Sequence, residues 1–319
     1  MKSMKISIAG AGAFGSAIAS VFAKGGHSTK LFSPTNFKEL CSTRVPRKLS
    51  NIKLPAEIDI VSSLEKTDKN EYLFLAVPTQ NLAFFCKENK SFLNDRPLIA
   101  CCKGVDQATG LRPSEILSEY SSKVAVMSGP SFAVDISKGM PTALVLASAE
   151  PGFLRKLQSD ISMHNFRLYR TSDVVGVELG GALKNIIAIA CGIAIGAKQG
   201  DSARAALMTR GFSEMIAFAE AHGAKEKTLT GLSGLGDLSL TCNSEKSRNF
   251  VFGVSLGCQK PFNKNITIEG VATAFAVSQK ARSIGLEMPI TSSVSALVEG
   301  SASIEEVINS LLSRPTKEE

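Results

Sequence analysis

The stretch Lys5-Ile-Ser-Ile-Ala-Gly-Ala-Gly-Ala-Phe-Gly15 decides the fold of this chain. Ile6 and Ile8, separated by small residues, predict a short buried strand that ends at Gly10. Apolar residues recur at helical spacing from Gly15 onward. The three glycines of this stretch therefore lie where a strand passes into a helix.

This glycine spacing is typical of a site for the pyrophosphate of a dinucleotide. Gly10 allows a tight turn, Gly12 lets the main chain approach the ligand, and Gly15 lets the helix pack closely on the strand. The first amides of the helix then face the anion at the positive end of the helix dipole. We expect a cofactor site here, formed with Ala13, although a purely structural turn is the alternative.

Length and composition describe a globular protein of about two domains. The chain has 319 residues, of which 44% are hydrophobic. The longest run of apolar or small residues, 186–197, is too short to cross a bilayer, and no secretory signal precedes the first strand. We therefore expect no stable membrane insertion.

The cysteines and the net charge indicate the cellular compartment and the class of ligand. Seven cysteines without a Cys-x-x-Cys spacing predict free thiols in a reducing cytoplasm, and we expect no metal. The net charge of +7 comes from basic residues spread along the chain, which favours an anionic small molecule and not nucleic acid. A homodimer is left open.

Strand-like and helix-like segments alternate through the first half of the chain. Further strands are predicted over residues 29–32, 58–61, 72–77, 97–102, 124–127, 143–147 and 166–169, with a helix over 152–159. This alternation indicates an α/β domain of Rossmann type with a mostly parallel sheet, expected over residues 1–172.

The second strand is not followed by the acidic residue that usually binds the ribose of NAD. Ser33, Pro34 and Thr35 stand there. Without this carboxylate, no negative charge directly after the strand would repel a 2'-phosphate. Three nearby cations could bind such a phosphate: Lys38, Arg44 and Arg47. We expect NADP to be preferred, with NAD possible.

Two other strand ends of the first half carry polar candidates. Lys103 follows the strand over 97–102, at the edge where open α/β sheets bind ligands. The stretch Ser128-Gly-Pro-Ser-Phe-Ala133 is a second strand-to-helix turn, which offers amides and a hydroxyl to an anion. A solvated lysine and a plain helix cap at Ser131 are the alternatives.

Residues 173–319 are predicted to form an all-helical domain. Its first long helix, expected over 176–198, carries Gly192, Gly196 and Gly200 four apart, which indicates close packing of another helix. Lys184 stands in the same helix among apolar residues. Loss of solvation lowers the pKa of an ammonium and suits it to proton transfer, whereas a lysine that reaches the surface is the alternative.

Three further segments of this domain hold charged candidates. A glycine-rich loop over 231–237 ends in Asp237, which either pairs with a buried lysine or is a cap or solvated group. Ser247-Arg-Asn249 on a helix can bind a phosphate, since arginine offers two parallel hydrogen bonds. Glu269 begins another helix, where an acid also suits the dipole.

These residues resemble the bacterial NAD(P)-dependent glycerol-3-phosphate dehydrogenases over nearly the whole chain. The specific motifs are Ser128-Gly-Pro-Ser-Phe-Ala133, Gly176-Val-Glu-Leu-Gly-Gly-Ala-Leu-Lys-Asn185, Arg204-Ala-Ala-Leu207, Gly234-Leu-Gly-Asp-Leu238 and Ser247-Arg-Asn249. The family reduces dihydroxyacetone phosphate to sn-glycerol 3-phosphate for phospholipid synthesis in the cytoplasm. The resemblance implies the same for this chain.

The resemblance also implies roles for individual residues. Lys184 is the expected acid/base, held by Asp237. The expected substrate contacts are Lys103, Gly129, Ser131, Lys184, Asp237, Ser247, Arg248 and Asn249. The expected further cofactor contacts are Phe14, Lys103, Ala133, Arg248 and Glu269.

The chain departs from the family pattern at two positions. Ser33-Pro34 replaces an arginine or histidine common after the second strand, which leaves the cofactor preference open, and Asp135 replaces a glutamate with its charge kept. Two other functions stay as alternatives: a two-domain reductase of a 2-oxo or 3-hydroxy acid, or a dinucleotide-binding sensor without catalysis.

Overall fold

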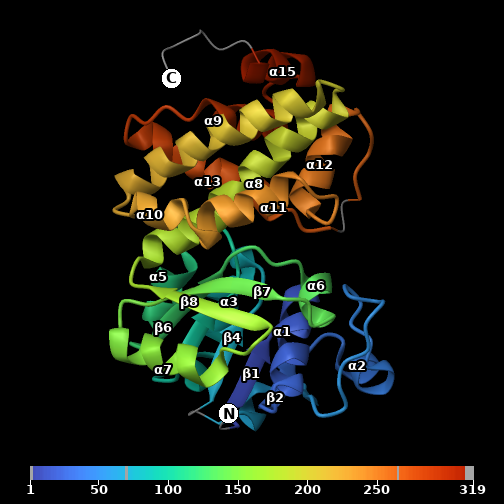
Figure 1. Ribbon diagram of the computed structural model, residues 1–319, viewed down its shortest axis with the longest axis vertical. Coiled ribbons are helices and arrows are strands. Elements are labelled where there is room, and N and C mark those ends of the chain that lie inside the picture. The colour runs from blue at the N-terminus through green and yellow to red at the C-terminus, as the bar shows by residue number, and fades with distance from the viewer. Residues whose placement is uncertain (1–2, 69–70, 264–265, 313–319) are drawn as a thin grey trace. The chain divides into compact units, whose positions relative to one another are not determined.

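The computed structural model describes residues 3–68, 71–263 and 266–312, and the chain divides into two compact units. One unit comprises Met1–Lys103 with Arg112–Val177, and the other comprises Gly104–Leu111 with Glu178–Glu319. Figure 1 labels the helices and strands of both units.

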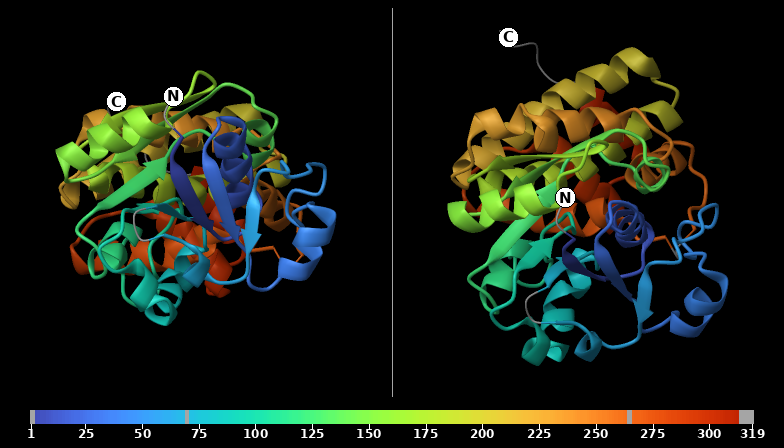
Figure 2. Two further views of the ribbon diagram at one scale, coloured as in Figure 1. Left: turned by 90° about the horizontal axis from the view of Figure 1, so that it is seen from below. Right: turned by 60° about the horizontal axis from the view of Figure 1, so that its bottom comes forward.

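One sheet of eight strands forms the centre of the first unit (Figure 2). The strand order is β3-β2-β1-β4-β5-β6-β7-β8; β6 and β7 pair antiparallel, and the other neighbouring strands of the described chain pair parallel. The chain leaves β1 toward β2 on one side and later returns to β4 on the other, a switch point at which ligands bind beyond the carboxyl ends of the strands. The strands are β1 Lys5–Ala9, β2 Ser28–Phe32, β3 Asp59–Val61, β4 Tyr72–Leu75, β5 Leu98–Ala100, β6 Val124–Ser128, β7 Thr142–Ala147 and β8 Phe166–Thr171.

Alternate strand residues supply the core on one face of this sheet. Ile6, Ile8 and Phe74 pack there with residues of α1 and α7, as the two-residue period of a strand requires. Buried residues of opposite parity, such as Ser7 and Leu73, show that the other face is covered as well. The helices of this unit are α1 Ala13–Lys24, α2 Phe37–Thr43, η1 Leu64–Lys66, α3 Thr79–Glu88, α4 Lys90–Leu93, α5 Pro113–Ser118, α6 Ala133–Ser137 and α7 Pro151–Ile161.

The predicted α/β fold with a mostly parallel sheet is confirmed, with differences at the ends of elements. The strands predicted over 72–77 and 97–102 are shorter, because the chain leaves the ladder after Leu75 and Ala100. The first helix begins at Ala13, earlier than the expected Gly15, since Gly12 already serves as its N-cap.

The described residues of the second unit contain helices and no strand. The helices from residue 174 onward are α8 Val174–Gly196, α9 Gly200–Ala221, α10 Glu226–Leu229, η2 Leu232–Gly236, α11 Asp237–Cys242, α12 Arg248–Gly257, α13 Glu269–Ser283, α14 Pro289–Glu299 and α15 Ile304–Leu312. Helix α8 is long and apolar enough to cross a membrane, yet 94% of its most apolar window is buried by protein. It has the burial of a core helix.

Helix α8 packs against α12 through glycines. A Cβ on Gly192 would lie 2.2 Å from the Phe250 carbonyl oxygen, and one on Gly196 would lie 2.2 Å from that of Val254. The packing interpretation of these two glycines is confirmed. It is wrong for Gly200, which has open space around it and a φ of +85° where α9 begins.

Candidate active site

The glycine turn after β1 has the geometry expected of a dinucleotide site. Gly10 has a φ of +109°, and a Cβ there would lie 2.7 Å from the Ala76 carbonyl oxygen beyond β4. A Cβ on Gly15 would lie 2.0 Å from the Gly10 oxygen, so the helix could not approach with any larger residue. A Cβ on Gly12 would have no other atom within 4 Å, so there is open space beside this residue.

The N-terminus of α1 suits an anionic ligand. Gly12 is its N-cap, no side chain caps its first amides, and its first turn carries no acidic residue. Ala13 and Phe14 begin the helix and are half-buried against the core of the sheet. Ala133 begins α6, which contacts α1. These residues fit a dinucleotide, whose pyrophosphate they would hold by main-chain amides.

The ends of β5 and β6 bring Lys103, Gly129 and Ser131 together. Lys103 Nζ donates to the Gly129 carbonyl oxygen at 3.1 Å, and Ser131 Oγ donates to the same oxygen at 3.0 Å. The φ of +139° at Gly129 allows this sharp exit from β6. Ser131 does not cap α6, whose N-cap is Phe132, so the alternative of a plain cap is wrong.

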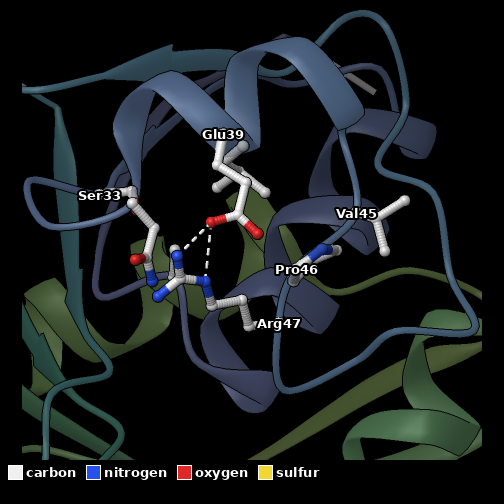
Figure 3. A pocket seen from close by; sticks show the side chains of 8 residues that line it. Ser33, Glu39, Val45, Pro46 and Arg47 are labelled. Atoms are coloured by element: carbon white, nitrogen blue, oxygen red, sulfur yellow. Dashed lines mark hydrogen bonds and ion pairs between the residues drawn. The ribbon is translucent and has the colours of Figure 1, made fainter.

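A shallow pocket opens beyond the carboxyl end of β2 (Figure 3). It joins the glycine turn to α2 and the following loop, and its lining residues are Ala11, Ser33, Asn36, Glu39, Leu40, Val45, Pro46 and Arg47. Arg47 Nε donates to Glu39 Oε2 at 2.7 Å, and a second guanidinium nitrogen contacts the same oxygen. A carboxylate thus stands in the pocket where the sequence showed none directly after β2.

The other two cations proposed for a 2'-phosphate do not line this pocket. Arg44 donates to the carbonyl oxygens of Leu54, Pro55 and Ile58, with the contact to Ile58 at 2.8 Å. Its guanidinium therefore holds the loop that follows α2. Lys38 lies on α2 with an exposed side chain.

In the second unit, Lys184 is buried and paired. Its Nζ donates to Asp237 Oδ1 at 2.7 Å and to Thr241 Oγ1 at 2.8 Å. The side chains of Lys184 and Asp237 are only 8% and 2% exposed. The alternatives of a lysine that reaches the surface and of a solvated aspartate are wrong, and the predicted pairing is confirmed.

Close backbone packing brings these residues together. A Cβ on Gly180, one turn before Lys184, would lie 2.6 Å from the Ser233 carbonyl oxygen, one turn before Asp237. Residues 232–237 are helical and do not form the predicted loop, because η2 runs directly into α11. Its glycines serve close packing, as at Gly234, where a Cβ would lie 1.9 Å from the Leu229 carbonyl oxygen.

Ser247, Arg248 and Asn249 form the first turn of α12, as predicted. Ser247 is the N-cap, and its Oγ accepts from the Phe250 amide at 3.2 Å. Asn249 Oδ1 accepts from the Gly270 amide at 3.0 Å, which ties this turn to the start of α13 beside Glu269. Arg248 is exposed and has no hydrogen bond or ion pair within the described chain, so its guanidinium is available to an anion.

The cysteines take no part in disulfides. All seven, each within the described residues, are free thiols. Burial raises the pKa of Cys242, next to Thr241, and that of Cys101, near Lys103. Both thiols are therefore protonated and unreactive at neutral pH.

Sequence reasoning missed two residues of these clusters. Thr241 lies four residues after Asp237 on the same face of α11, a spacing that could have indicated a second partner for Lys184. Glu39 carried no such signal, because its contact with Arg47 depends on how the loop returns toward α2.

Comparison with known proteins assigns the chain to a family. Residues 5–153 match the model of the NAD-dependent glycerol-3-phosphate dehydrogenase N-terminus, and residues 173–309 match that of the C-terminus. Glycerol-3-phosphate dehydrogenase [NAD(P)+] of Roseobacter denitrificans is 48% identical over 99% of this chain and 100% of its own. The Paracoccus denitrificans protein of the same name is also 48% identical, with the same coverage of both chains.

A solved structure agrees with these matches. The crystal structure of glycerol-3-phosphate dehydrogenase from Coxiella burnetii has a TM-score of 0.91 and 33% identity, over 98% of this chain and 99% of its own. The resemblance in the sequence motifs is thereby confirmed. This chain belongs to the family of NAD-dependent glycerol-3-phosphate dehydrogenases.

Proposed function

We propose that this protein reduces dihydroxyacetone phosphate reversibly to sn-glycerol 3-phosphate with NADPH or NADH, in the cytoplasm, for glycerophospholipid synthesis. The observation that carries the proposal is Lys184, buried in α8 and hydrogen bonded to Asp237 and Thr241, in a chain of this family. The proposed substrate is a small anion, in keeping with the net charge of +7.

Lys184 is proposed as the general acid. Reduced nicotinamide, when bound, supplies a hydride to the C2 carbonyl carbon. Negative charge then grows on the carbonyl oxygen, and a nearby ammonium stabilises that charge and gives up a proton to it. In the reverse direction the neutral amine of Lys184 takes the proton from the C2 hydroxyl.

Asp237 and Thr241 position this ammonium. Two acceptors at 2.7 and 2.8 Å hold the Nζ ammonium in a fixed position. The Thr241 hydroxyl donates in turn to the Asp237 carbonyl oxygen at 2.6 Å, so α11 holds both acceptors in register. Such positioning supplies a large part of an enzymatic rate.

The phosphate of the substrate needs a separate set of donors. Arg248 is exposed at the N-terminus of α12, where helix dipole and guanidinium favour the same anion. Ser247 and Asn249 flank it. Lys103, Gly129 and Ser131 are proposed to bind the rest of the substrate, and Lys103 also the cofactor.

Residues of the first unit would hold the dinucleotide. The proposed contacts are Gly10, Gly12, Ala13, Phe14, Gly15, Lys103 and Ala133, with Arg248 and Glu269 of the second unit. The division into a dinucleotide-binding domain and a substrate domain near residue 172 is part of the same proposal.

A direct assay tests the proposal. Purified protein is mixed with dihydroxyacetone phosphate, and loss of reduced nicotinamide absorbance is followed for NADPH and for NADH separately. We expect turnover with both cofactors. A protein that binds NADPH but oxidises it with no ketone would instead be a sensor.

Inorganic phosphate distinguishes the remaining alternative. Competition by phosphate against the ketone supports a phosphate site at Arg248, whereas a reductase of 2-oxo acids would use a carboxylate clamp and accept a substrate without phosphate. Sedimentation of the same sample measures whether the chain forms the homodimer left open above.

A further inference from the structure

We propose that the Glu39–Arg47 ion pair sets the preference between NADP and NAD, with Arg47 as the residue that binds the 2'-phosphate. This inference rests on the proposed function and concerns the part of the cofactor site that would bind the adenosine ribose. Its basis is the pocket beyond β2, which contains both side chains and extends to Ala11 in the glycine turn.

The pocket lies where the ribose of a dinucleotide is expected. In an open α/β sheet the adenosine end of the ligand extends from the glycine turn toward the carboxyl end of the second strand. Here that end is Phe32, followed by Ser33, whose amide donates to the Val61 carbonyl oxygen at 3.0 Å. Ala11 and Ser33 line the same pocket and so connect the two parts of the site.

Arg47 is the cation of this pocket that can change partners. Its side chain is 63% exposed and that of Glu39 is 45% exposed, so water competes for the pair. Exposed ion pairs of this kind are weak, because water screens both charges. A dianionic phosphate offers the guanidinium stronger, two-pronged hydrogen bonds than the single Glu39 oxygen does.

The other cations cannot substitute for Arg47 without a cost. Arg44, with a φ of 56°, holds three carbonyl oxygens, of which those of Leu54 and Ile58 lie at 3.4 and 2.8 Å. Moving its guanidinium would leave the base of the loop without these bonds. The loop is thus fixed at Arg44, while Arg47 three residues later remains exposed beside the pocket.

Glu39 gives the pocket its tolerance for NAD. Its carboxylate can accept hydrogen bonds from the 2'-hydroxyl of the ribose, as the acidic residue after the second strand does in other dinucleotide sites. The same carboxylate repels a 2'-phosphate and competes for Arg47. A site with both groups binds both cofactors, and the balance between the two side chains determines the ratio.

Equilibrium binding of two fragments tests the proposal without catalysis. Isothermal titration calorimetry measures the dissociation constants of adenosine 2',5'-bisphosphate and of 5'-AMP for the parent protein and for each variant. We expect Arg47→Ala to weaken binding of the bisphosphate by about 10- to 100-fold, the range of a lost charge-assisted pair, and binding of 5'-AMP by less than about threefold.

Substitution of the partner should act in the opposite direction. Glu39→Gln keeps the size of the side chain and removes its charge, so we expect the bisphosphate to bind about 3- to 10-fold more tightly. The same variant should bind NADH less tightly than the parent does. Arg155→Ala is the matched control, because Arg155 is an exposed arginine of α7 and its loss changes the net charge equally.

Equal loss of both fragments in Arg47→Ala, or no change in either, overturns the inference. Loss of bisphosphate binding in Arg155→Ala to the same extent would also overturn it, since net charge would then be the cause. The proposed function fails separately, if the parent protein binds NADPH or NADH but does not turn over dihydroxyacetone phosphate.

Discussion

Two lysine–carboxylate pairs with a buried carboxylate have similar distances and different surroundings. Lys184 lies 2.7 Å from Asp237 in the helical unit, and Lys30 lies 3.2 Å from Glu71 in the sheet unit. In the helical pair both side chains are almost fully buried. In the sheet pair the carboxylate is 2% exposed, but the lysine is 25% exposed.

The partners of the two pairs also differ. Glu71 accepts from the Ser7 hydroxyl and from Lys30, and Ser7 and Lys30 are opposite each other in the register of β1 and β2. Glu71 lies just before the amino end of β4. The glycine turn lies at the other end of β4, next to Ala76. We infer that the sheet pair fixes strand register and that only the helical pair serves chemistry.

Burial of a lysine–carboxylate pair therefore does not by itself identify a catalytic group. Burying two charges costs desolvation that the pair often only just recovers, so such a pair is weak evidence for stability as well. The exposure of the lysine, 8% for Lys184 and 25% for Lys30, and the element that carries it distinguish the two pairs here.

Truncation of the two lysines should separate the roles of the two pairs most clearly. Lys184→Ala removes the proposed acid, and we expect kcat to fall about a thousandfold, within the range of general acid catalysis. The dissociation constant for NADPH, followed by fluorescence, should change little. Lys30→Ala is the matched control, with the same chemical change and kcat of the folded enzyme retained.

Parent-like reduction of dihydroxyacetone phosphate by Lys184→Ala would show that this lysine is not the acid. A comparable loss of kcat in folded Lys30→Ala would remove the distinction between the two pairs.

The second largest effect should be on stability. Glu71→Ala leaves Lys30 and Ser7 without their buried acceptor, and we expect the free energy of unfolding to fall by about 3 kcal/mol. Urea denaturation measures it. Lys5→Ala breaks the Lys5–Asp68 pair, whose side chains are 66% and 40% exposed. That control should cost less than about 1 kcal/mol. Equal losses in both variants would contradict a structural role for Glu71.

The sequence predicted the sheet pair poorly and the helical pair well, for physical reasons. Lys184 stood out because its helix has almost no other charge, and the family motifs named Asp237. Glu71 gave no signal, since a carboxylate before a strand is ordinary and its burial arises from strand order. Strand positions followed from apolar runs, whereas their ends did not, because hydrogen-bond partners decide where a ladder stops.

Glycines were the least predictable feature. Gly10 and Gly15 were interpreted correctly because a strand precedes them and a helix follows. Gly234 and Gly236 were expected in a loop, yet they lie in a helical segment, where the absence of Cβ at Gly234 permits close backbone contact. A glycine-rich segment has the same composition whether it forms a turn or a closely packed helix, so only tertiary contacts distinguish the two structures.

Thr241 offers a smaller and more selective test of the helical pair. Thr241→Val keeps the shape and removes the acceptor for Lys184 Nζ, so we expect kcat to fall about 10-fold, the equivalent of one hydrogen bond of about 1.4 kcal/mol. Thr241→Ser restores the hydroxyl and should restore most of the rate. Similar kcat values for the valine and serine variants would show that Thr241 only fills space.

The smallest expected effect concerns a buried ionisable group without a counter-charge at hydrogen-bond distance. Burial lowers the pKa of His27 from its ordinary value of 6.5, with partial opposition from Asp160. Its Nδ1 accepts from the Met4 amide at 3.2 Å, and its buried Nε2 has no hydrogen-bond partner among the described residues. The folded protein therefore favours neutral His27.

This lowered pKa gives stability a definite dependence on pH. As the pH falls below about 6.5, the unfolded chain gains the proton first, so the free energy of unfolding decreases until the folded pKa is reached. His27→Gln should flatten this part of the curve, as measured by urea midpoints at pH 7.5, 6.5 and 5.5. An unchanged slope in His27→Gln would mean that another group causes the loss of stability in acid.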